Sequence, residues 1–103
     1  MSELRMTPAR LVLLQAIADG AVMQHYSFGD HDYVEWDRGP DPAFWSHGGR
    51  RRETVTGRAR ELRVAGLVRL TRTPIDYAYN DPRLLELMSA GAAVLAEHAK
   101  TTP

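Results

Sequence analysis

The chain has 103 residues, of which 44% are apolar, and its thirteen basic side chains balance thirteen acidic ones. This length predicts a single domain, residues 1–103, with a small core. No apolar run is long enough to cross a bilayer, the N-terminal segment lacks a signal-peptide core, and there is no cysteine for a disulfide or a thiolate metal site. We therefore expect a cytoplasmic protein with no membrane partner and no cofactor.

The charges are unevenly distributed along the chain. Residues 50–72 hold eight arginines and two acids, a local balance of +6, and the other residues have a balance of −6. A molecule polarised in this way can bind a polyanion on one side although its net charge is zero. Arginine also suits bidentate contacts with phosphate and guanine.

Residues 7–19 predict the first helix. Thr7 can cap the first turn, Pro8 suits the first helical position, and Gly20 ends the helix. One apolar stripe is expected to face the core: Leu11, Leu14, Ile17 and Ala18.

Residues 21–37 change character and predict a β-hairpin inserted after the first helix. Residues 27–30 are turn-like, and the flanking residues include several that favour strands: Val22, Tyr26, Tyr33, Val34 and Trp36. The segment that follows contains too much glycine and proline for a long element, although residues 42–45 can form one helical turn.

Residues 52–65 predict the second helix, which ends at Gly66. Four residues line its core side at helical spacing: Val55, Ala59, Leu62 and Ala65. Four others fall on the opposite side, with Arg52 and Arg63 flanking it: Glu53, Thr56, Gly57 and Arg60. A glycine inside a helix costs about 1 kcal/mol, but on an exposed face it allows a partner to approach the backbone closely.

Residues 67–72 alternate as a strand, and the residues after them permit two arrangements. In the first, residues 77–79 form the return strand and a long helix begins at residue 81. In the second, residues 74–82 are a loop, residues 83–87 are the return strand, and a shorter helix begins near Ser89. Residues 101–103 are expected to be a frayed tail.

Three passages resemble the winged helix-turn-helix domains of MarR-like regulators from bacteria or phage. The first contains Val55-Thr56, Arg60-Glu61-Leu62 and Ala65-Gly66-Leu67-Val68, and is similar to a recognition helix from which the wing strand leaves directly. The second, Asn80-Asp81-Pro82-Arg83, is similar to the aspartate–arginine wing of that family. The third, Leu87-Met88-Ser89-Ala90-Gly91 with Leu95, resembles the start of the closing helix.

This resemblance implies an α+β, winged-helix domain of about three helices and a β-hairpin wing, with the 21–37 hairpin as an extra element. The chain departs from the family at Met88, where a capping threonine is usual, and in residues 21–48, which do not supply the expected second helix. The aspartate–arginine passage favours the second arrangement of the C-terminal part.

The function that the resemblance implies is binding of double-stranded DNA by a transcriptional regulator. The recognition helix 52–65 would enter the major groove and the wing, about residues 67–88, would contact the backbone or minor groove. Arg50, Arg51 and Arg52 would contact phosphates at the mouth of the helix. The full set of expected DNA-binding residues is Arg50, Arg51, Arg52, Thr54, Thr56, Gly57, Arg60, Arg63, Arg72 and Arg83.

Regulators of this type usually bind two half-sites as homodimers. The final helix and nearby residues are candidates for the dimer surface: Leu84, Leu85, Leu87, Met88, Val94 and Leu95. Alternatively, these residues fill the core of the monomer, because a chain of this size needs most of its apolar side chains inside. The sequence indicates no particular effector ligand.

Other functions compete with DNA binding. The arginine-rich helix can be a solvated face, or the acidic, aromatic hairpin can bind a protein on the same scaffold. His25, Asp30, His31, Asp32 and Glu35 suggest a metal site, but their spacing matches no strong ligand motif. No nucleophile elbow, phosphate loop or metalloprotease helix is present, so we do not expect an enzyme.

Overall fold

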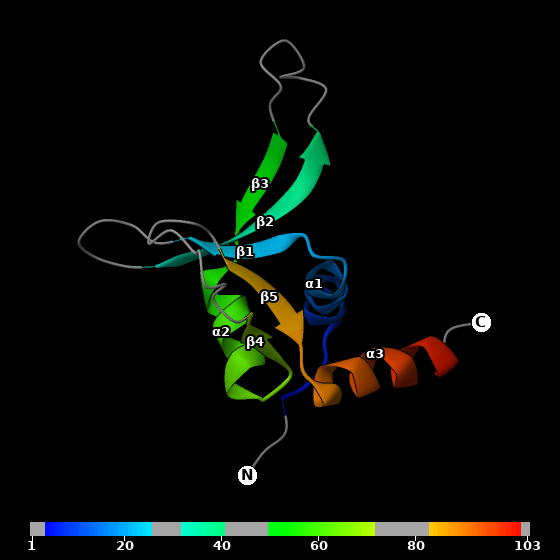
Figure 1. Cartoon of the computed structure of the whole chain (residues 1–103). Helices are drawn as coiled ribbons and strands as arrows, with labels where there is room; N and C mark the ends of the chain where they lie inside the picture. The colour runs from blue at the N-terminus through cyan, green and yellow to red at the C-terminus, as the bar shows by residue number, and fades with distance from the viewer. Residues whose placement is uncertain (1–3, 26–31, 41–49, 72–82, 102–103) are drawn as a thin grey trace.

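The protein is an α+β domain in which helices pack against a five-stranded antiparallel sheet (Figure 1). The structure, a computed structural model, describes residues 4–25, 32–40, 50–71 and 83–101. In these residues the elements are α1 (Pro8–Ala18), β1 (Val22–His25), β2 (Tyr33–Pro40), β3 (Arg50–Thr54), α2 (Thr56–Val64), β4 (Val68–Leu70), β5 (Arg83–Leu87) and α3 (Ser89–Thr101).

The strand order is β3-β2-β1-β5-β4, and the register divides the sheet into an inner and an outer face. The inner face carries the apolar residues that pack against α1 and α2: Val22, Val34, Trp36, Val68 and Leu85. Residues directly opposite one another share a face. Leu84, Met23, Glu35 and Thr54 therefore form one row across the outer face. Polar residues alternate with apolar ones because only one face is buried.

Helix α1 begins and ends where the sequence predicts. The Thr7 hydroxyl accepts from the backbone N–H of Arg10, and Pro8 occupies the first turn. At the other end Gly20 has φ +76°, and the N–H groups of Gly20 and Ala21 donate back into the last turn. The predicted stripe is only partly correct: Leu14 and Ile17 are buried, but Leu11 is half-buried and Ala18 is exposed.

The predicted hairpin is confirmed by the antiparallel pairing of β1 with β2. Strand β2 continues to Pro40, beyond the predicted limit at residue 37, and pairs on its other side with β3. Figure 1 shows β2 and β3 rising together above the helices. The predicted turn at residues 27–30 and helical turn at residues 42–45 lie outside the described residues.

The predicted helix 52–65 is wrong in its first turn. Arg50–Thr54 form strand β3, and α2 begins only at Thr56. Cross-strand pairing with β2 decides this, since Arg52 lies opposite Asp37 and Thr54 opposite Glu35. Val55, Ala59 and Leu62 are buried as expected, whereas Ala65 is the exposed C-cap.

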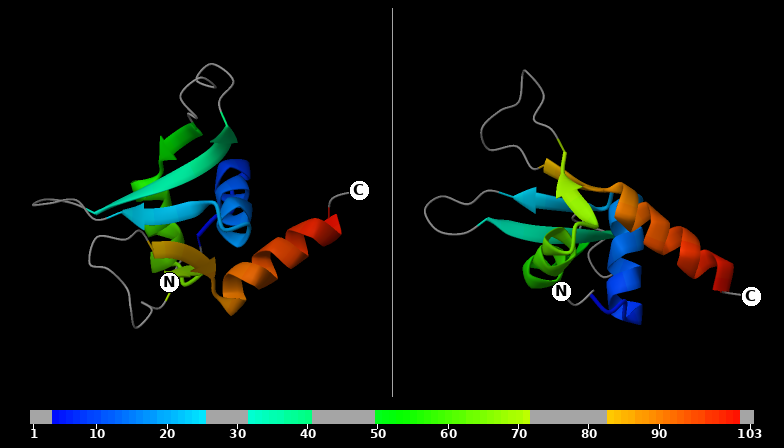
Figure 2. Two further views of the ribbon diagram at one scale, coloured as in Figure 1. Left: turned by 45° about the horizontal axis from the view of Figure 1, so that its top comes forward. Right: turned by 90° about the horizontal axis from the view of Figure 1, so that it is seen from below.

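The second arrangement of the C-terminal part is confirmed in its strand and its helix, and its predicted loop at residues 74–82 lies outside the described residues. Arg83–Leu87 form the return strand β5 between β1 and β4, and α3 begins at Ser89. A Cβ on Gly91 would lie 2.2 Å from the carbonyl oxygen of Leu67, so a glycine lets the first turn of α3 contact the start of β4. Helix α3 continues through Thr101, where the tail was predicted to begin, and leads away from the sheet (Figure 2). In the described part of the chain no helix is long and apolar enough to span a membrane.

Candidate functional site

The exposed side of α2 is one part of the predicted site that the structure leaves accessible. Ala59 and Leu62 face the core, while Gly57, Arg60 and Arg63 are exposed. Val64 continues this side of the helix and is 84% exposed. Val64 therefore lies beside Arg60 and Arg63 on the surface of α2.

Hydrogen bonds at both ends fix the position of α2. At its start, Val55 donates its N–H to Val34 O at 2.8 Å, and Val34 donates its own N–H to the Thr56 hydroxyl at 3.0 Å. At its end, Gly66 has φ +78°, and the Leu67 N–H donates to Leu62 O at 3.0 Å. Thr56, predicted to face outward, is therefore half-buried and holds the helix to β2 through its hydroxyl.

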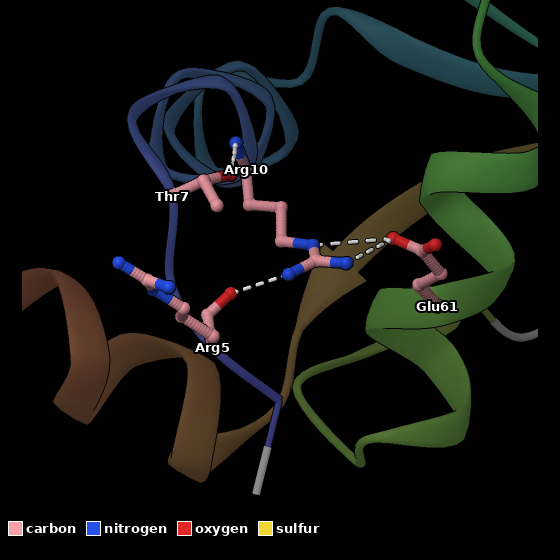
Figure 3. A network of polar contacts seen from close by, with 4 residues as sticks. All are labelled: Arg5, Thr7, Arg10 and Glu61. Atoms are coloured by element: carbon pink, nitrogen blue, oxygen red, sulfur yellow. Dashed lines mark hydrogen bonds and ion pairs between the residues drawn. The ribbon is translucent and has the colours of Figure 1, made fainter.

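An ion pair between helices engages the acid of α2, Glu61. Figure 3 shows Arg10 of α1 donating from Nε and Nη2 to the Glu61 carboxylate, at 3.1 and 2.9 Å. The remaining terminal nitrogen of Arg10 donates to the carbonyl oxygen of Arg5 at 2.6 Å. Because Glu61 pairs with Arg10 of α1, Arg60 and Arg63 have no carboxylate partner on their own helix.

Acids on neighbouring strands compensate most of the other arginines. Four ion pairs join them across the sheet or from sheet to helix: Arg50 with Asp37 (2.6 Å), Arg52 with Glu35 (3.8 Å), Arg69 with Glu86 (2.7 Å), and Arg58 with Glu53, which also contacts Arg38. Within the described residues, Arg51 and Arg60 have no polar partner, and Arg63 has only the amide of Gln24. The local excess of positive charge is therefore much smaller than the count of arginines indicates.

The contacts of Asp37 with Gly39 and Arg50 perturb the titration of its carboxylate. The N–H of Gly39 donates to its Oδ1 at 2.9 Å, and Arg50 donates to Oδ2. The hydrogen bond from Gly39, followed by that from Arg50, lowers the pKa of Asp37 below its ordinary value of 3.8. At neutral pH this carboxylate is a fixed negative charge that holds Arg50 on the sheet.

The other predicted DNA-binding residues do not gather at α2. Thr54 lies on the outer face of the sheet opposite Glu35. Arg51 lines a separate concavity beside Trp36 and Val12. Arg83 begins β5 opposite Gln24 and donates to the carbonyl oxygen of Thr71. Arg72 lies outside the described residues.

A pocket of about 630 Å³ adjoins α2 on the side of the β1–β2 pair. Its lining residues are Gln24, Asp32, Tyr33, Val34, Thr56, Arg60 and Arg63. Gln24 is 7% exposed, and its amide accepts from Arg63 at 3.3 Å and donates to Asp32 at 3.4 Å. The sequence prediction did not include Gln24, although it follows Val22 by two residues and therefore occupies an inward position of the predicted strand.

The residues proposed for a metal site have other contacts. His25 stacks on Tyr33, with ring centroids 5.0 Å apart, and its Nε2 lies 3.5 Å from Glu35. Among the described residues no group of three or more His, Asp or Glu side chains can hold a metal ion, and Asp30 and His31 are outside them. Trp36, the expected anchor of a protein-binding hairpin, is buried beneath the guanidinium of Arg38.

Comparison of the chain with models of known protein families, with curated proteins and with solved structures gives no match. The geometry of the site is therefore the basis on which a function can be inferred.

Proposed function

We propose that the protein binds double-stranded DNA and that α2 is the helix that enters the major groove. The observation that carries this proposal is the exposed side of α2. There Gly57 is exposed, and Arg60 and Arg63 have no acidic partner among the described residues. Arginine can donate two hydrogen bonds to guanine, and Val64 offers apolar contact with a thymine methyl group.

The arrangement around α2 supports a variant of the winged-helix fold. Helix α2 is followed directly by β4, the return strand β5 lies between β4 and β1, and α1 packs against α2. In this proposal β2 and β3 stand where a second helix is expected, and β4 and β5 form the base of the wing. The wing would then lie beside the helix that reads the groove.

The decisive experiment compares single substitutions in a DNA-binding assay. Arg60→Ala and Arg63→Ala should each weaken binding by about tenfold or more, because a good arginine–base contact contributes about 1–3 kcal/mol. Lys100→Ala removes one positive charge from the distant end of α3 and should leave binding almost unchanged. Duplexes selected from random sequences supply the probe for this gel-shift measurement.

The proposal fails if no duplex is selected at low salt by folded protein. It also fails if Lys100→Ala weakens binding as much as Arg60→Ala does, because the interaction would then depend only on total charge.

A homodimer that binds two half-sites remains part of the proposal. Several of the expected dimer residues instead fill the monomer core, since Leu85 is buried and Leu87, Val94 and Leu95 pack against the core. Leu84 and Met88 are each 39% exposed and are the members of that set that a second copy can reach. Sedimentation equilibrium with and without a two-site duplex measures the stoichiometry.

A further inference from the structure

The pocket between α2 and the β1–β2 pair combines three features. Its volume, about 630 Å³, is within the range of small-molecule sites. Its floor is a buried amide, and its rim carries two guanidinium groups and one carboxylate. None of these side chains is needed to complete the apolar core.

Gln24 occupies an inward-facing position where the neighbouring inward residues, Val22 and Val34, are apolar. Burying an amide is unfavourable unless hydrogen bonds satisfy it. Its two bonds, to Arg63 at 3.3 Å and to Asp32 at 3.4 Å, are long, and both partners belong to the pocket rim. The amide is therefore oriented by groups that can exchange these bonds for bonds to a ligand.

The charges of the rim define the class of ligand. Arg60 and Arg63 provide guanidinium donors, and the Thr56 hydroxyl, which accepts from Val34, still has its own proton to donate. Donors from three residues that line one pocket suit the oxygens of a phosphate group. Asp32 adds an acceptor on the same rim, which suits a hydroxyl or amino group elsewhere in the ligand.

We propose that this pocket binds a small phosphate monoester of nucleotide size, with Arg60 and Arg63 at the phosphate and with Gln24 and Asp32 at the polar remainder of the ligand. Binding requires no contact with DNA. A second consequence does rest on the proposed function: the same two arginines serve the DNA-binding side of α2, so an occupied pocket competes with DNA.

Isothermal titration with adenosine monophosphate tests the pocket itself. The expected result is saturable binding that weakens at least about tenfold in Arg60→Gln, which removes a charge-assisted contact. Arg51→Gln is the matched control, because Arg51 is also exposed and without a partner among the described residues but does not line the pocket. Adenosine, which lacks the phosphate, should bind much more weakly. Circular dichroism confirms that each variant is folded.

Three results would overturn the pocket proposal: no saturable heat with adenosine monophosphate, equal weakening in Arg51→Gln and Arg60→Gln, or equal binding of adenosine. The competition is measured separately, by titrating the nucleotide into a preformed DNA complex. If the nucleotide binds and no duplex does, the pocket stands and the proposed function fails. If both bind without competing, the shared role of the two arginines is wrong.

Discussion

Arg60 and Arg63 are accessible because of where the acids of the chain are placed. Glu61, their neighbour on α2, is held by Arg10 across the gap between the helices, and Glu53 is held by Arg58 and Arg38. Surface ion pairs of this kind contribute only about 0–1 kcal/mol each to stability. Their larger effect is to decide which arginines remain available for a partner.

A substitution at Gly57 tests whether DNA approaches the backbone of α2 closely. It is exposed at the start of α2, and a Cβ added there would meet no atom of the protein within 4 Å. Gly57→Ala should therefore preserve the fold, and can raise the free energy of unfolding by up to about 1 kcal/mol through helix propensity. If DNA approaches the backbone at this point, the added methyl group weakens binding severalfold, as measured by gel shift.

Thermal unfolding of the same Gly57→Ala protein is the control for that measurement. A variant with unchanged DNA affinity and unchanged or higher melting temperature would show that DNA does not contact the backbone at residue 57.

Part of the stability that the pairing of β2 with β3 provides depends on pH. The pKa of Asp37 is lowered by the Gly39 N–H and by Arg50, so the folded state favours the charged form. A carboxyl with a lowered pKa stabilises the fold above its ordinary value of 3.8, and this stabilisation is lost as the pH falls through the lower folded-state value.

We therefore expect Asp37→Asn to be less stable than the wild type at neutral pH, with a difference that shrinks as the pH falls below 3.8. Urea midpoints of both proteins across this range measure the difference, and the subtraction removes the titration of other groups. A difference that is constant with pH would mean that the hydrogen bonds from Gly39 and Arg50 do not stabilise the charged form of Asp37.

The contact of α3 with Leu67, the residue before β4, depends on Gly91. The carbonyl oxygen of Leu67 accepts from the Met88 N–H at 2.9 Å and would lie 2.2 Å from a Cβ at residue 91. Since the obstructing atom belongs to the backbone, it cannot rotate away, and Gly91→Ala should cost about 1–3 kcal/mol, as overpacking in a core does. Chemical denaturation measures the loss, and Gly57→Ala is the matched substitution without an overlap. Equal stability of the two variants would contradict this reading of the contact.

Elements with strong local signals could be predicted from the sequence, and elements decided by distant partners could not. The ends of α1 follow from Thr7, Pro8 and Gly20, which act within one turn. Strand β3 follows from pairing with β2, where Glu35 and Asp37 lie opposite Thr54 and Arg52. No residue of Arg50–Arg52 favours a strand strongly by itself, so a prediction from local pattern extended the helix too far.

The candidate site was predictable to a similar extent. The helical spacing of Ala59 and Leu62 correctly placed Arg60 and Arg63 on the exposed side of α2. The pocket beside them was not predicted, because it requires the β1–β2 pair to lie next to α2. The compensation of four arginines by acids on other elements is likewise a property of the folded molecule.

At the scale of the whole molecule, this compensation changes the expected electrostatics of binding. The sequence alone predicts that about six phosphates are neutralised, because residues 50–72 have a balance of +6. In the described part of that stretch, Arg51, Arg60 and Arg63 are the arginines without a carboxylate partner. Because Arg51 lines a separate concavity, binding through α2 uses Arg60 and Arg63. It would release counterions from about two phosphates, since an arginine held by a carboxylate must first give up that pair.

A plot of the logarithm of the DNA association constant against the logarithm of salt concentration should therefore have a slope of about −2, and not the value of about −5 that six contacts give. Fluorescence anisotropy over a range of salt concentrations measures it, and Arg60→Ala should make the slope shallower by about one. A slope near −5 in the wild type would show that DNA displaces the carboxylates of the sheet from their arginines. The ion pairs between strands would then open on binding, and the sheet as well as α2 would form the interface.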